Sequence, residues 1–252
     1  MRMGALLGPI VEPTDHRSLA EQARAYVDAG YTSLWSAHAI GRGFMVTDPF
    51  VALTAAATAV GSLDASVEIG TAVLQLPLYH PIDVAHKTYS LQQMCDSRFV
   101  LGVGAGSTET EFNLFERDYS SRFAEFNKHV DALRQAFQAD PNPLTPWPNV
   151  AEGPALYYGT WGNGVKRAAQ QFDGWIASGH YRSVDEVCQA HADYTQAGGG
   201  RSIVSTLQID GKTDLGEMGE KLVRFAEAGF DDAVIMRLPG APTSEAIRRL
   251  ID

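Results

Sequence analysis

The chain has little cysteine, and its two cysteines, Cys95 and Cys188, lie far apart. Both fall in segments with a helical pattern, where cysteine is more often a small buried hydrophobe than half of a disulfide or a metal ligand. The seven histidines form no H-E-x-x-H motif or other short ligand pair, so no metal is predicted. G-x-S-x-G and Walker motifs are also absent from the sequence. The scarcity of cysteine favours a cytoplasmic protein.

Positive charge and long apolar runs are scarce as well. There are 20 lysines and arginines against 30 aspartates and glutamates, which gives a net charge of −10. This balance provides no basic surface for nucleic acid or for an anionic membrane. No run approaches about 18 apolar residues and no leader pattern opens the chain, so neither a membrane span nor a secretory signal is expected.

What the chain does have is enough apolar sequence for one large core. Its 252 residues are 45% hydrophobic, near the size at which a single barrel or doubly wound domain stops growing. Short apolar runs alternate with helical patterns, as in parallel sheets surrounded by helices. Strands are expected at 3–7, 31–36, 65–76, 98–104, 155–158, 174–178, 202–209 and 232–238. Helices are expected at 17–29, 49–60, 81–95, 122–137, 163–172, 183–197, 215–228 and 243–251.

This count gives eight strand and helix units. Two of them, "EQARAYVDAGYTSLW" (21–35) and "EKLVRFAEAGFDDAVI" (220–235), share a glutamate, a glycine nine positions later, an aromatic residue and a strand. Eight units in about 250 residues are typical of a (β/α)8 barrel, whereas a doubly wound sheet uses fewer strands. We therefore predict an α/β fold, a single-domain (β/α)8 TIM barrel over residues 1–252. The proline-rich segment 139–154 is expected to be a loop, either a plain connection or a lid.

Three glycines, Gly102, Gly104 and Gly106, end the fourth predicted strand. Their spacing is not the G-x-G-x-x-G of a dinucleotide-binding turn, because Ser107 stands where the third glycine of that motif would fall. In a barrel, ligand-binding loops lie at the carboxyl ends of strands. The glycines therefore either clear space for a flat ring or ease a tight exit from the strand, and their spacing does not separate the two readings.

The segment that follows, 107–120, is expected to be a polar loop, because the next helical pattern begins only near Ser121. Glu109 and Glu111 lie in it. Two positions apart, their carboxylates would point the same way only on a strand, so a solvated loop is the preferred interpretation.

A second glycine-rich turn, "GTWGNGVKRAAQ" (159–170), precedes a predicted helix. Asn163 is a capping-type residue directly before the helical run, so free backbone N–H groups and the positive helix end would face outward together. Such a turn can bind an anion, although an ordinary capped helix gives the same pattern.

Four stretches follow one another in an order that is specific in combination. They are "DPFVALTAAATAV" (48–60), "EIGTAVLQLPLYHPIDVAHKTYSLQQMCDSRFVLGVGAG" (68–106), "SRFAEFNKHVDALRQAF" (121–137) and "YYGTWGNGVKRAAQQFDGWIASG" (157–179). Together they resemble the bacterial luciferase-like flavin and deazaflavin oxidoreductases, the last stretch resembling the cofactor-phosphate loop of that family. The resemblance covers nearly the whole chain.

The resemblance implies a barrel enzyme that holds FMN or the deazaflavin coenzyme F420 at the carboxyl face and transfers a hydride between the ring and a small organic substrate. F420 is slightly favoured over a monooxygenase reaction with reduced FMN. His38, in "WSAH" after the second strand, is the implied proton donor or acceptor at the reactive ring atom. The implied cofactor-binding residues are Ser36, Ala72, Val73, Gly104, Ala105, Gly106, Ser107, Gly159, Thr160, Gly162, Asn163 and Gly164.

Further expectations come from the same resemblance. Ala72 and Val73 would lie behind the ring, where the family commonly has a non-prolyl cis peptide bond. Family members are frequently dimers, so a homodimer is expected on this ground alone. Two departures concern the deazaflavin members, which often have acids where this chain has Ala37 and Ser107. Because of these departures, the choice between FMN and F420 stays open. An alternative function also stays open, in which the chain is a non-catalytic barrel paralogue that binds a flavin or a protein partner.

Overall fold

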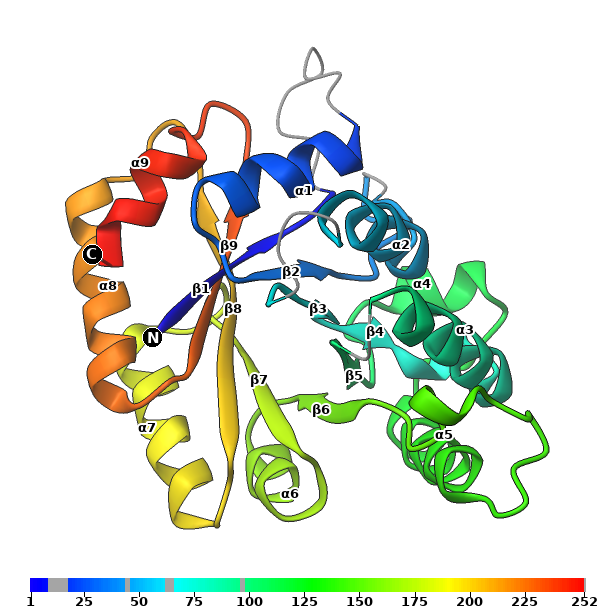
Figure 1. Cartoon of the computed structure of the whole chain (residues 1–252). Coiled ribbons are helices and arrows are strands. Elements are labelled where there is room, and N and C mark those ends of the chain that lie inside the picture. Colours follow the sequence, from blue (N-terminus) through cyan, green and yellow to red (C-terminus); the bar gives the residue numbers. More distant parts are fainter. Residues whose placement is uncertain (9–17, 44–45, 62–65, 96–97, 252) are drawn as a thin grey trace.

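Short apolar segments form the strands of a closed parallel barrel, and helices surround it (Figure 1). The computed structural model describes residues 1–8, 18–43, 46–61, 66–95 and 98–251. The strands are β1 (Arg2–Leu6), β2 (Ser33–Ser36), β3 (Glu68–Thr71), β4 (Leu74–Gln75), β5 (Phe99–Gly104), β6 (Ala155–Gly159), β7 (Gly174–Ser178), β8 (Arg201–Ile209) and β9 (Asp232–Arg237).

The helices lie between and after these strands, as the sequence pattern predicts. The α-helices are α1 (Leu19–Asp28), α2 (Pro49–Val60), α3 (Pro81–Met94), α4 (Glu109–Leu114), α5 (Arg122–Gln138), α6 (Asn163–Gln171), α7 (Val184–Gln196), α8 (Leu215–Ala228) and α9 (Ser244–Arg248). Short 3-10 helices are η1 (Leu76–Leu78), η2 (Pro148–Val150) and η3 (Arg249–Ile251). No helix in the described part of the chain is long and apolar enough to cross a membrane.

The strand order closes the barrel. Neighbouring strands run β3-β2-β1-β9-β8-β7-β6-β5-β4, and an additional pairing of β3 with β5 completes the ring. β3 and β4 both pair with β5, so they are two halves of one barrel strand and the barrel has eight positions. The predicted (β/α)8 TIM barrel is confirmed.

Within the expected strand 65–76, the ladder is interrupted at Ala72 and Val73, whose connecting peptide bond is cis. Two predicted boundaries, residue 17 of the first helix and residue 65 of this strand, lie outside the described residues.

Helix boundaries follow local hydrogen bonding. At the start of α8, the Asp214 carboxylate accepts from the backbone N–H groups of Gly216 and Glu217, at 2.7 and 3.1 Å. At its end, Gly229 takes the left-handed conformation with φ 99°, which glycine adopts at little cost. Both signals can be read from sequence, and the predicted helix 215–228 has the observed bounds.

The segment 107–120 is not the polar loop predicted from sequence, because it contains α4. This helix is too short to show a clear apolar period, and its Glu111 is fully buried. The segment 139–154 is irregular apart from η2, as predicted. It leads from α5 to the amino end of β6, so it lies at the opposite end of the barrel from the cavity described below and does not form a lid over it.

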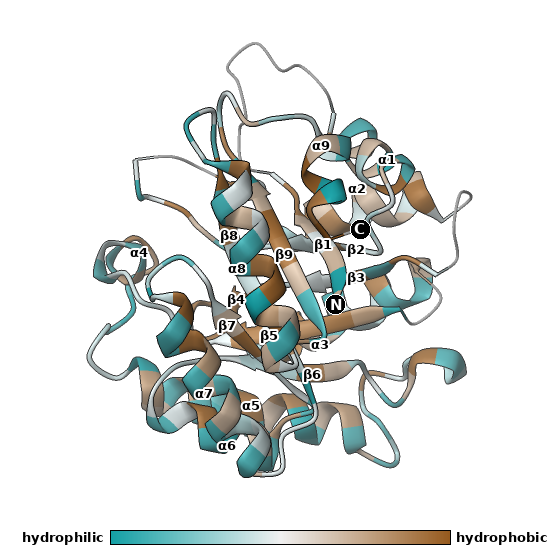
Figure 2. Ribbon diagram, turned by 90° about the vertical axis from the view of Figure 1, so that its left-hand side faces the viewer, coloured by the Kyte–Doolittle hydropathy of each residue, from teal (hydrophilic) through white to brown (hydrophobic). Residues whose placement is uncertain are grey.

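Apolar side chains fill two layers. One lies between strands and helices, where Figure 2 shows brown strands and helices with teal outer faces. The other fills the barrel interior with Leu6, Trp35, Ala72, Val100, Tyr157, Ile176, Ile203 and Val234. Cys95 is buried and Cys188 is partly buried, and no disulfide bond joins them.

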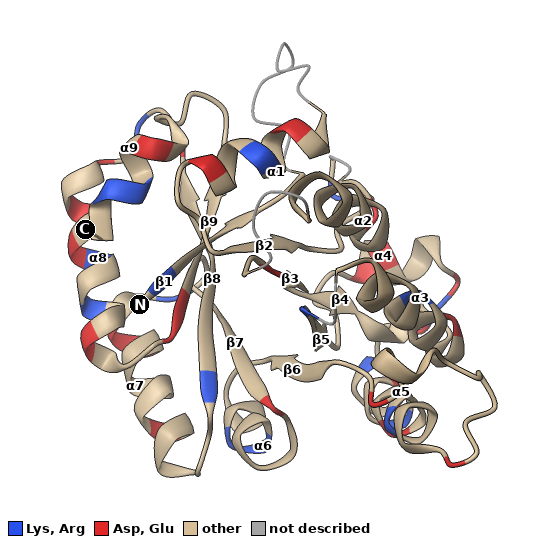
Figure 3. Cartoon of the chain, in the orientation of Figure 1, with Lys and Arg blue, Asp and Glu red and all other residues tan. Residues whose placement is uncertain are grey.

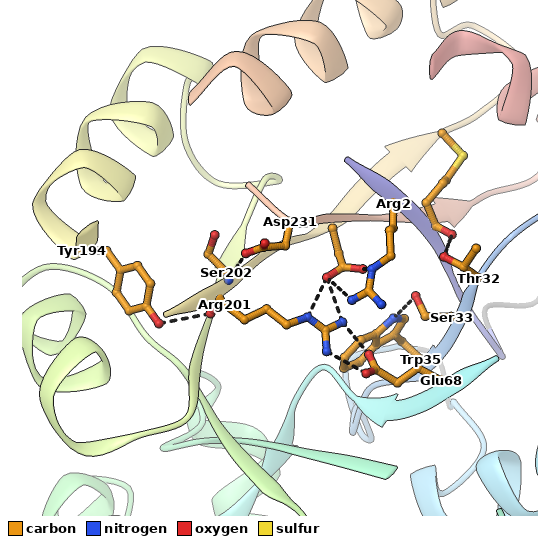
Figure 4. Close-up of polar contacts among 11 residues, drawn as sticks. Arg2, Thr32, Ser33, Trp35, Glu68, Tyr194, Arg201, Ser202 and Asp231 are labelled. Atoms are coloured by element: carbon orange, nitrogen blue, oxygen red, sulfur yellow. Dashed lines mark hydrogen bonds and ion pairs between the residues drawn. The ribbon is translucent and has the colours of Figure 1, made fainter. Parts of the chain in front are cut away.

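Charged residues lie mostly on the helices (Figure 3), but one cluster closes the amino end of the barrel (Figure 4). Arg201 donates two hydrogen bonds to the Glu68 carboxylate, at 2.6 and 2.7 Å, and one to Asp232 at 2.9 Å. Asp232 is fully buried and also forms an ion pair with Arg2 at 2.8 Å. The amino end of the barrel interior therefore carries a cluster of paired charges, of which Glu68 and Arg201 also line a separate cavity.

Candidate active site

A cavity of about 480 Å³ opens at the carboxyl end of the barrel strands, where barrel enzymes place their sites. Strand ends supply its apolar walls, including Leu6, Ile176 and Met236. Among the predicted site residues, those that line it are His38, Ala72, Val73, Gly104, Ala105, Gly106, Ser107, Gly159 and Thr160. Its size and its apolar walls with few polar groups are typical of a small-molecule site.

Four predicted site residues do not line this cavity. Ser36 is fully buried in β2, and its carbonyl accepts from the Ala72 N–H at 2.8 Å. Gly162, Asn163 and Gly164 lie at the start of α6, and the first two of them border a separate groove between α6 and α7. Thr160 and Trp161 line the cavity and lead directly to this helix start.

The turn before α6 differs from the prediction. The capping position is held by Gly162, with φ 59°, and Asn163 is the first helical residue without a side-chain capping bond. The N–H of Gly164 donates to the Trp161 carbonyl at 3.2 Å, and that of Val165 to the Gly162 carbonyl at 3.0 Å. Two of the backbone donors that the sequence pattern leaves free for an anion are therefore bonded within the turn.

The three glycines of β5 and its exit make room chiefly for the protein's own groups. A methyl group on Gly102 would lie 2.0 Å from the Thr71 carbonyl oxygen, and one on Gly104 would lie 2.8 Å from the Val73 side chain. Gly106 has φ 82°, and a methyl group there would lie 2.7 Å from Gln75. Gly104 and Gly106 line the cavity, as the first interpretation of the glycines predicts. Close packing against neighbouring side chains also requires their small size, as the second interpretation predicts.

His38 lies in the wall of the cavity, just after β2. Its backbone N–H donates to the Val73 carbonyl at 3.1 Å, and its ring packs edge-on against Tyr79 and Phe115, with centroid distances of 5.3 and 6.0 Å. Burial lowers the pKa of His38, while nearby Glu111 opposes that shift. Since the shift is downward, the imidazole is neutral at physiological pH.

A buried polar network that sequence reasoning missed lies behind His38. The Glu111 carboxylate accepts from the Ile40 backbone N–H at 2.9 Å, from the Arg42 guanidinium at 2.6 Å and from the Gln75 amide at 2.9 Å. Burial favours its neutral form, but these hydrogen bonds outweigh burial and hold the pKa of Glu111 below its ordinary value. No signal in the chain pairs Arg42 with a glutamate 69 positions later, so only the fold reveals the network.

The outer rim of the cavity carries exposed aromatic side chains. Phe123 and Tyr181 line it and are 54% and 65% exposed. The Arg182 guanidinium lies 4.9 Å from the centre of the Trp161 ring, which places a cation between the cavity and the start of α6. The site thus combines apolar walls with two histidines, His38 and His180, and with two arginines, Arg42 and Arg182. Among the described residues, no group of three His, Cys, Asp or Glu side chains could hold a metal ion.

Comparison with known proteins assigns the family. The sequence model described as luciferase-like monooxygenase matches residues 4–206, which is most of the chain. The chain therefore belongs to the luciferase-like monooxygenase family, as the motif order predicts.

Curated relatives are similar over part of their length. The 4-hydroxyprotoasukamycin monooxygenase of Streptomyces nodosus subsp. asukaensis is 29% identical over 118 residues, which cover 46% of this chain and 30% of that protein. The alkanal monooxygenase beta chain of Aliivibrio fischeri is 30% identical over 109 residues, 42% of this chain and 33% of that protein. The match spans about a third of the length of these relatives.

Solved structures share the fold over almost the whole chain. The monooxygenase RslO1 from Streptomyces bottropensis has a TM-score of 0.80 at 16% identity, covering 99% of this chain and 97% of that chain. An F420-dependent secondary alcohol dehydrogenase in complex with an F420-acetone adduct has a TM-score of 0.75 at 16% identity, covering 99% and 98%. The oxygenating constituent of 3,6-diketocamphane monooxygenase from Pseudomonas putida, in complex with FMN, has a TM-score of 0.67 at 15% identity, covering 88% and 71%.

Proposed function

We propose that this chain is an oxidoreductase that binds reduced FMN or coenzyme F420 in the cavity at the carboxyl end of the barrel and acts there on a small, apolar organic molecule. The observation that carries the proposal is the placement of His38. Its imidazole lies in the wall of a mainly apolar cavity of about 480 Å³, and burial lowers the pKa of His38 and so favours the neutral ring.

The cavity fits the ring system of such a cofactor in shape and chemistry. Its walls come from Leu6, Ala72, Val73 and Ile176, so a flat aromatic ring would bury its faces against apolar atoms. A methyl group on Gly104 or Gly159 would lie 2.8 or 2.5 Å from the Val73 side chain, so these glycines leave room for Val73 in the wall. Arg182 lines the cavity and would supply a positive charge for the cofactor's phosphate.

When bound, the ring would supply the hydride or the electron pair for the reaction. The chain's own part is smaller and more specific. His38 would hydrogen-bond to the reacting atoms and exchange a proton with them, because histidine can cycle between imidazole, which accepts a proton, and imidazolium, which donates one. The apolar walls would exclude water from the reacting centre and so protect a reactive species.

Two forms of the reaction are compatible with this site. Three of the curated relatives are named monooxygenases, which supports oxygen chemistry with reduced FMN. Both an F420-dependent dehydrogenase and an FMN-containing monooxygenase share the fold, so hydride transfer to or from F420 is compatible with it as well. The exposed aromatic rim of Phe123 and Tyr181 supports an apolar substrate in either case.

A binding titration tests the proposal. The purified protein is titrated with FMN, reduced FMN and F420, and intrinsic and cofactor fluorescence are followed in parallel. Micromolar binding of F420 alone would define a hydride-transfer reductase or dehydrogenase, whereas preference for reduced FMN would define a monooxygenase. Binding of none of the three would overturn the proposal and favour the non-catalytic paralogue.

A further inference from the structure

We propose that Gln75 and Glu111 are positioning residues that fix the orientation and the tautomer of His38, so that its Nε2 atom carries the hydrogen and faces a bound molecule. The functional part of this inference rests on the role proposed for His38. The structural part, the tautomer itself, does not depend on any cofactor.

The first step is that Glu111 is an ionised anchor. Its side chain has no exposed surface, and three donors from the strand ends and loops converge on its two oxygens. Arg42 supplies the opposite charge at 2.6 Å, so the buried carboxylate is both paired and hydrogen-bonded. The bonds to Ile40 and Arg42 fasten the segment that follows His38 to α4.

The second step is that Glu111 orients the Gln75 amide. The Gln75 Nε2 atom donates to the Glu111 carboxylate at 2.9 Å and to the His38 carbonyl at 3.2 Å. Both partners are acceptors only, so the reverse orientation would place the amide oxygen against two other oxygens. The Gln75 Oε1 atom instead points toward Gly106 and has no hydrogen-bond partner among the described residues. The amide is therefore fixed with its nitrogen toward His38.

The third step is the consequence for the imidazole. The same Gln75 Nε2 atom lies 3.3 Å from the His38 Nδ1 atom. A hydrogen on Nδ1 would face the amide hydrogens, so Nδ1 is the unprotonated nitrogen and Nε2 carries the hydrogen in the neutral ring. Among the described residues, the hydrogen bond of the His38 ring is made at Nδ1, and His38 lines the cavity. An Nε2–H donor is thus left for a molecule in the cavity.

Packing between α4 and the same segment supports the arrangement. Gly41 has φ 73°, and a methyl group there would lie 2.3 Å from the Leu114 side chain. Phe115, directly after α4, packs edge-on against the His38 ring at a centroid distance of 6.0 Å. Helix α4 therefore holds His38 through Glu111 and Gln75, and Phe115 at its end packs against the same ring.

The test is ¹⁵N nuclear magnetic resonance of histidine-labelled, cofactor-free protein, at a pH where His38 is neutral. The His38 signals are assigned by their loss in His38→Gln. We expect a protonated Nε2 and an unprotonated Nδ1 in the unmodified protein. In Gln75→Leu and in Glu111→Gln, the preference should be lost and the two tautomers should mix. Gln92→Leu is the matched control, because Gln92 is also a buried glutamine (2% exposed) but lies on α3, away from His38, and it should leave the tautomer unchanged.

A hydrogen on Nδ1 in the unmodified protein, or an unchanged tautomer in both Gln75→Leu and Glu111→Gln, would overturn the inference. Glu111→Gln keeps the shape of the side chain, so it remains informative if Gln75→Leu does not fold. In the cofactor-loaded enzyme, both substitutions should lower kcat by about 100-fold, as expected for a displaced catalytic group, with little change in cofactor affinity. Failure of cofactor binding would contradict the proposed function and leave the tautomer result intact.

Discussion

The two ends of the barrel each bury a carboxylate against arginine, yet they differ in what else the carboxylate reaches. At the amino end, Asp232 binds Arg2 and Arg201, and Arg201 in turn binds Glu68 (Figure 4). Glu68 and Arg201 line a separate cavity at this end, but their charges are paired with each other. At the carboxyl end, the Glu111 carboxylate binds Arg42 and also connects, through an amide, to a histidine with an unused nitrogen at a cavity wall.

The comparison shows that a buried ion pair is not by itself a sign of function. In the amino-end cluster, charged side chains lose their hydration and gain ion pairs with one another. Such a cluster contributes mainly to the stability of the fold and the register of the strands. A network that ends on a polar group at a cavity wall, here the His38 imidazole, leaves that group able to hydrogen-bond to a molecule bound in the cavity. Substitutions at the two ends should therefore separate turnover from stability.

The largest effect is expected from His38→Ala. Loss of a general acid or base lowers turnover by about 10² to 10⁴-fold, while cofactor affinity and thermal stability should change little because the ring lies in the cavity wall. Steady-state kinetics with the cofactor that binds, together with a parallel cofactor titration, measure both. Unchanged turnover would show that His38 has no catalytic role.

The next effect is expected at the amino end, from Asp232→Asn. Removing the charge leaves Arg2 and Arg201 without their shared buried partner, so the free energy of unfolding should fall by about 3 kcal/mol. Turnover per folded molecule should be unchanged. Chemical denaturation and kinetics on the same preparation check this. A loss of turnover without a loss of stability would contradict the expectation that the amino-end cluster stabilises the fold and takes no part in the reaction.

A third, intermediate effect concerns pH. Burial lowers the pKa of both His38, near the cavity, and His191, which bonds Ser202 at the amino end of β8. Their unfolded value is near 6.5, so the folded state binds protons less tightly than the unfolded chain. The resulting stability is complete above about pH 6.5 and is lost as the pH falls through the lowered values.

Thermal unfolding from pH 8 down to pH 5 tests this expectation. The midpoint should be level above neutrality and should fall in the acid range, and His38→Gln or His191→Gln should each remove part of the fall. The pH profile of turnover should respond to His38→Gln alone. An equal response to His191→Gln would contradict the separation of the two ends.

The smallest effect is expected at the rim, from Tyr181→Ala. The side chain is 65% exposed, so its loss should change the free energy of unfolding by less than about 0.5 kcal/mol. If the rim receives an apolar substrate, KM should rise by a few-fold while kcat stays the same. Val223→Ala, a substitution of another exposed apolar residue far along α8, serves as the control and should leave KM unchanged.

The sequence predicted the fold because its signals are local. Capping residues and glycines, such as Asp214 and Gly229 around α8, mark helix ends without reference to the rest of the chain. His38 and the strand-end residues of the cavity were also predictable, because the motif order places them at the carboxyl ends of barrel strands.

The remaining part of the site depends on contacts between distant segments. Glu111 resembles a solvated loop residue until the fold brings Ile40, Arg42 and Gln75 around it. The capping position before α6 was misassigned by one residue, because Asn163 is a common capping residue but Gly162 supplies the positive φ that this turn uses. The residue preferences of the turn alone do not decide between Gly162 and Asn163 as the N-cap, because the backbone conformation of the folded chain sets where α6 begins.

One comparison of cofactor affinities tests the central claim, that the cavity beside His38 holds a reduced flavin or deazaflavin. Ser178 lies at the end of β7 and lines the cavity, so Ser178→Trp should fill much of it. The account predicts micromolar binding of reduced FMN or F420 to the unmodified protein, and a weakening of roughly tenfold or more in Ser178→Trp without a change in thermal stability. Equal affinity in the two proteins, or no binding to the unmodified protein, would contradict it.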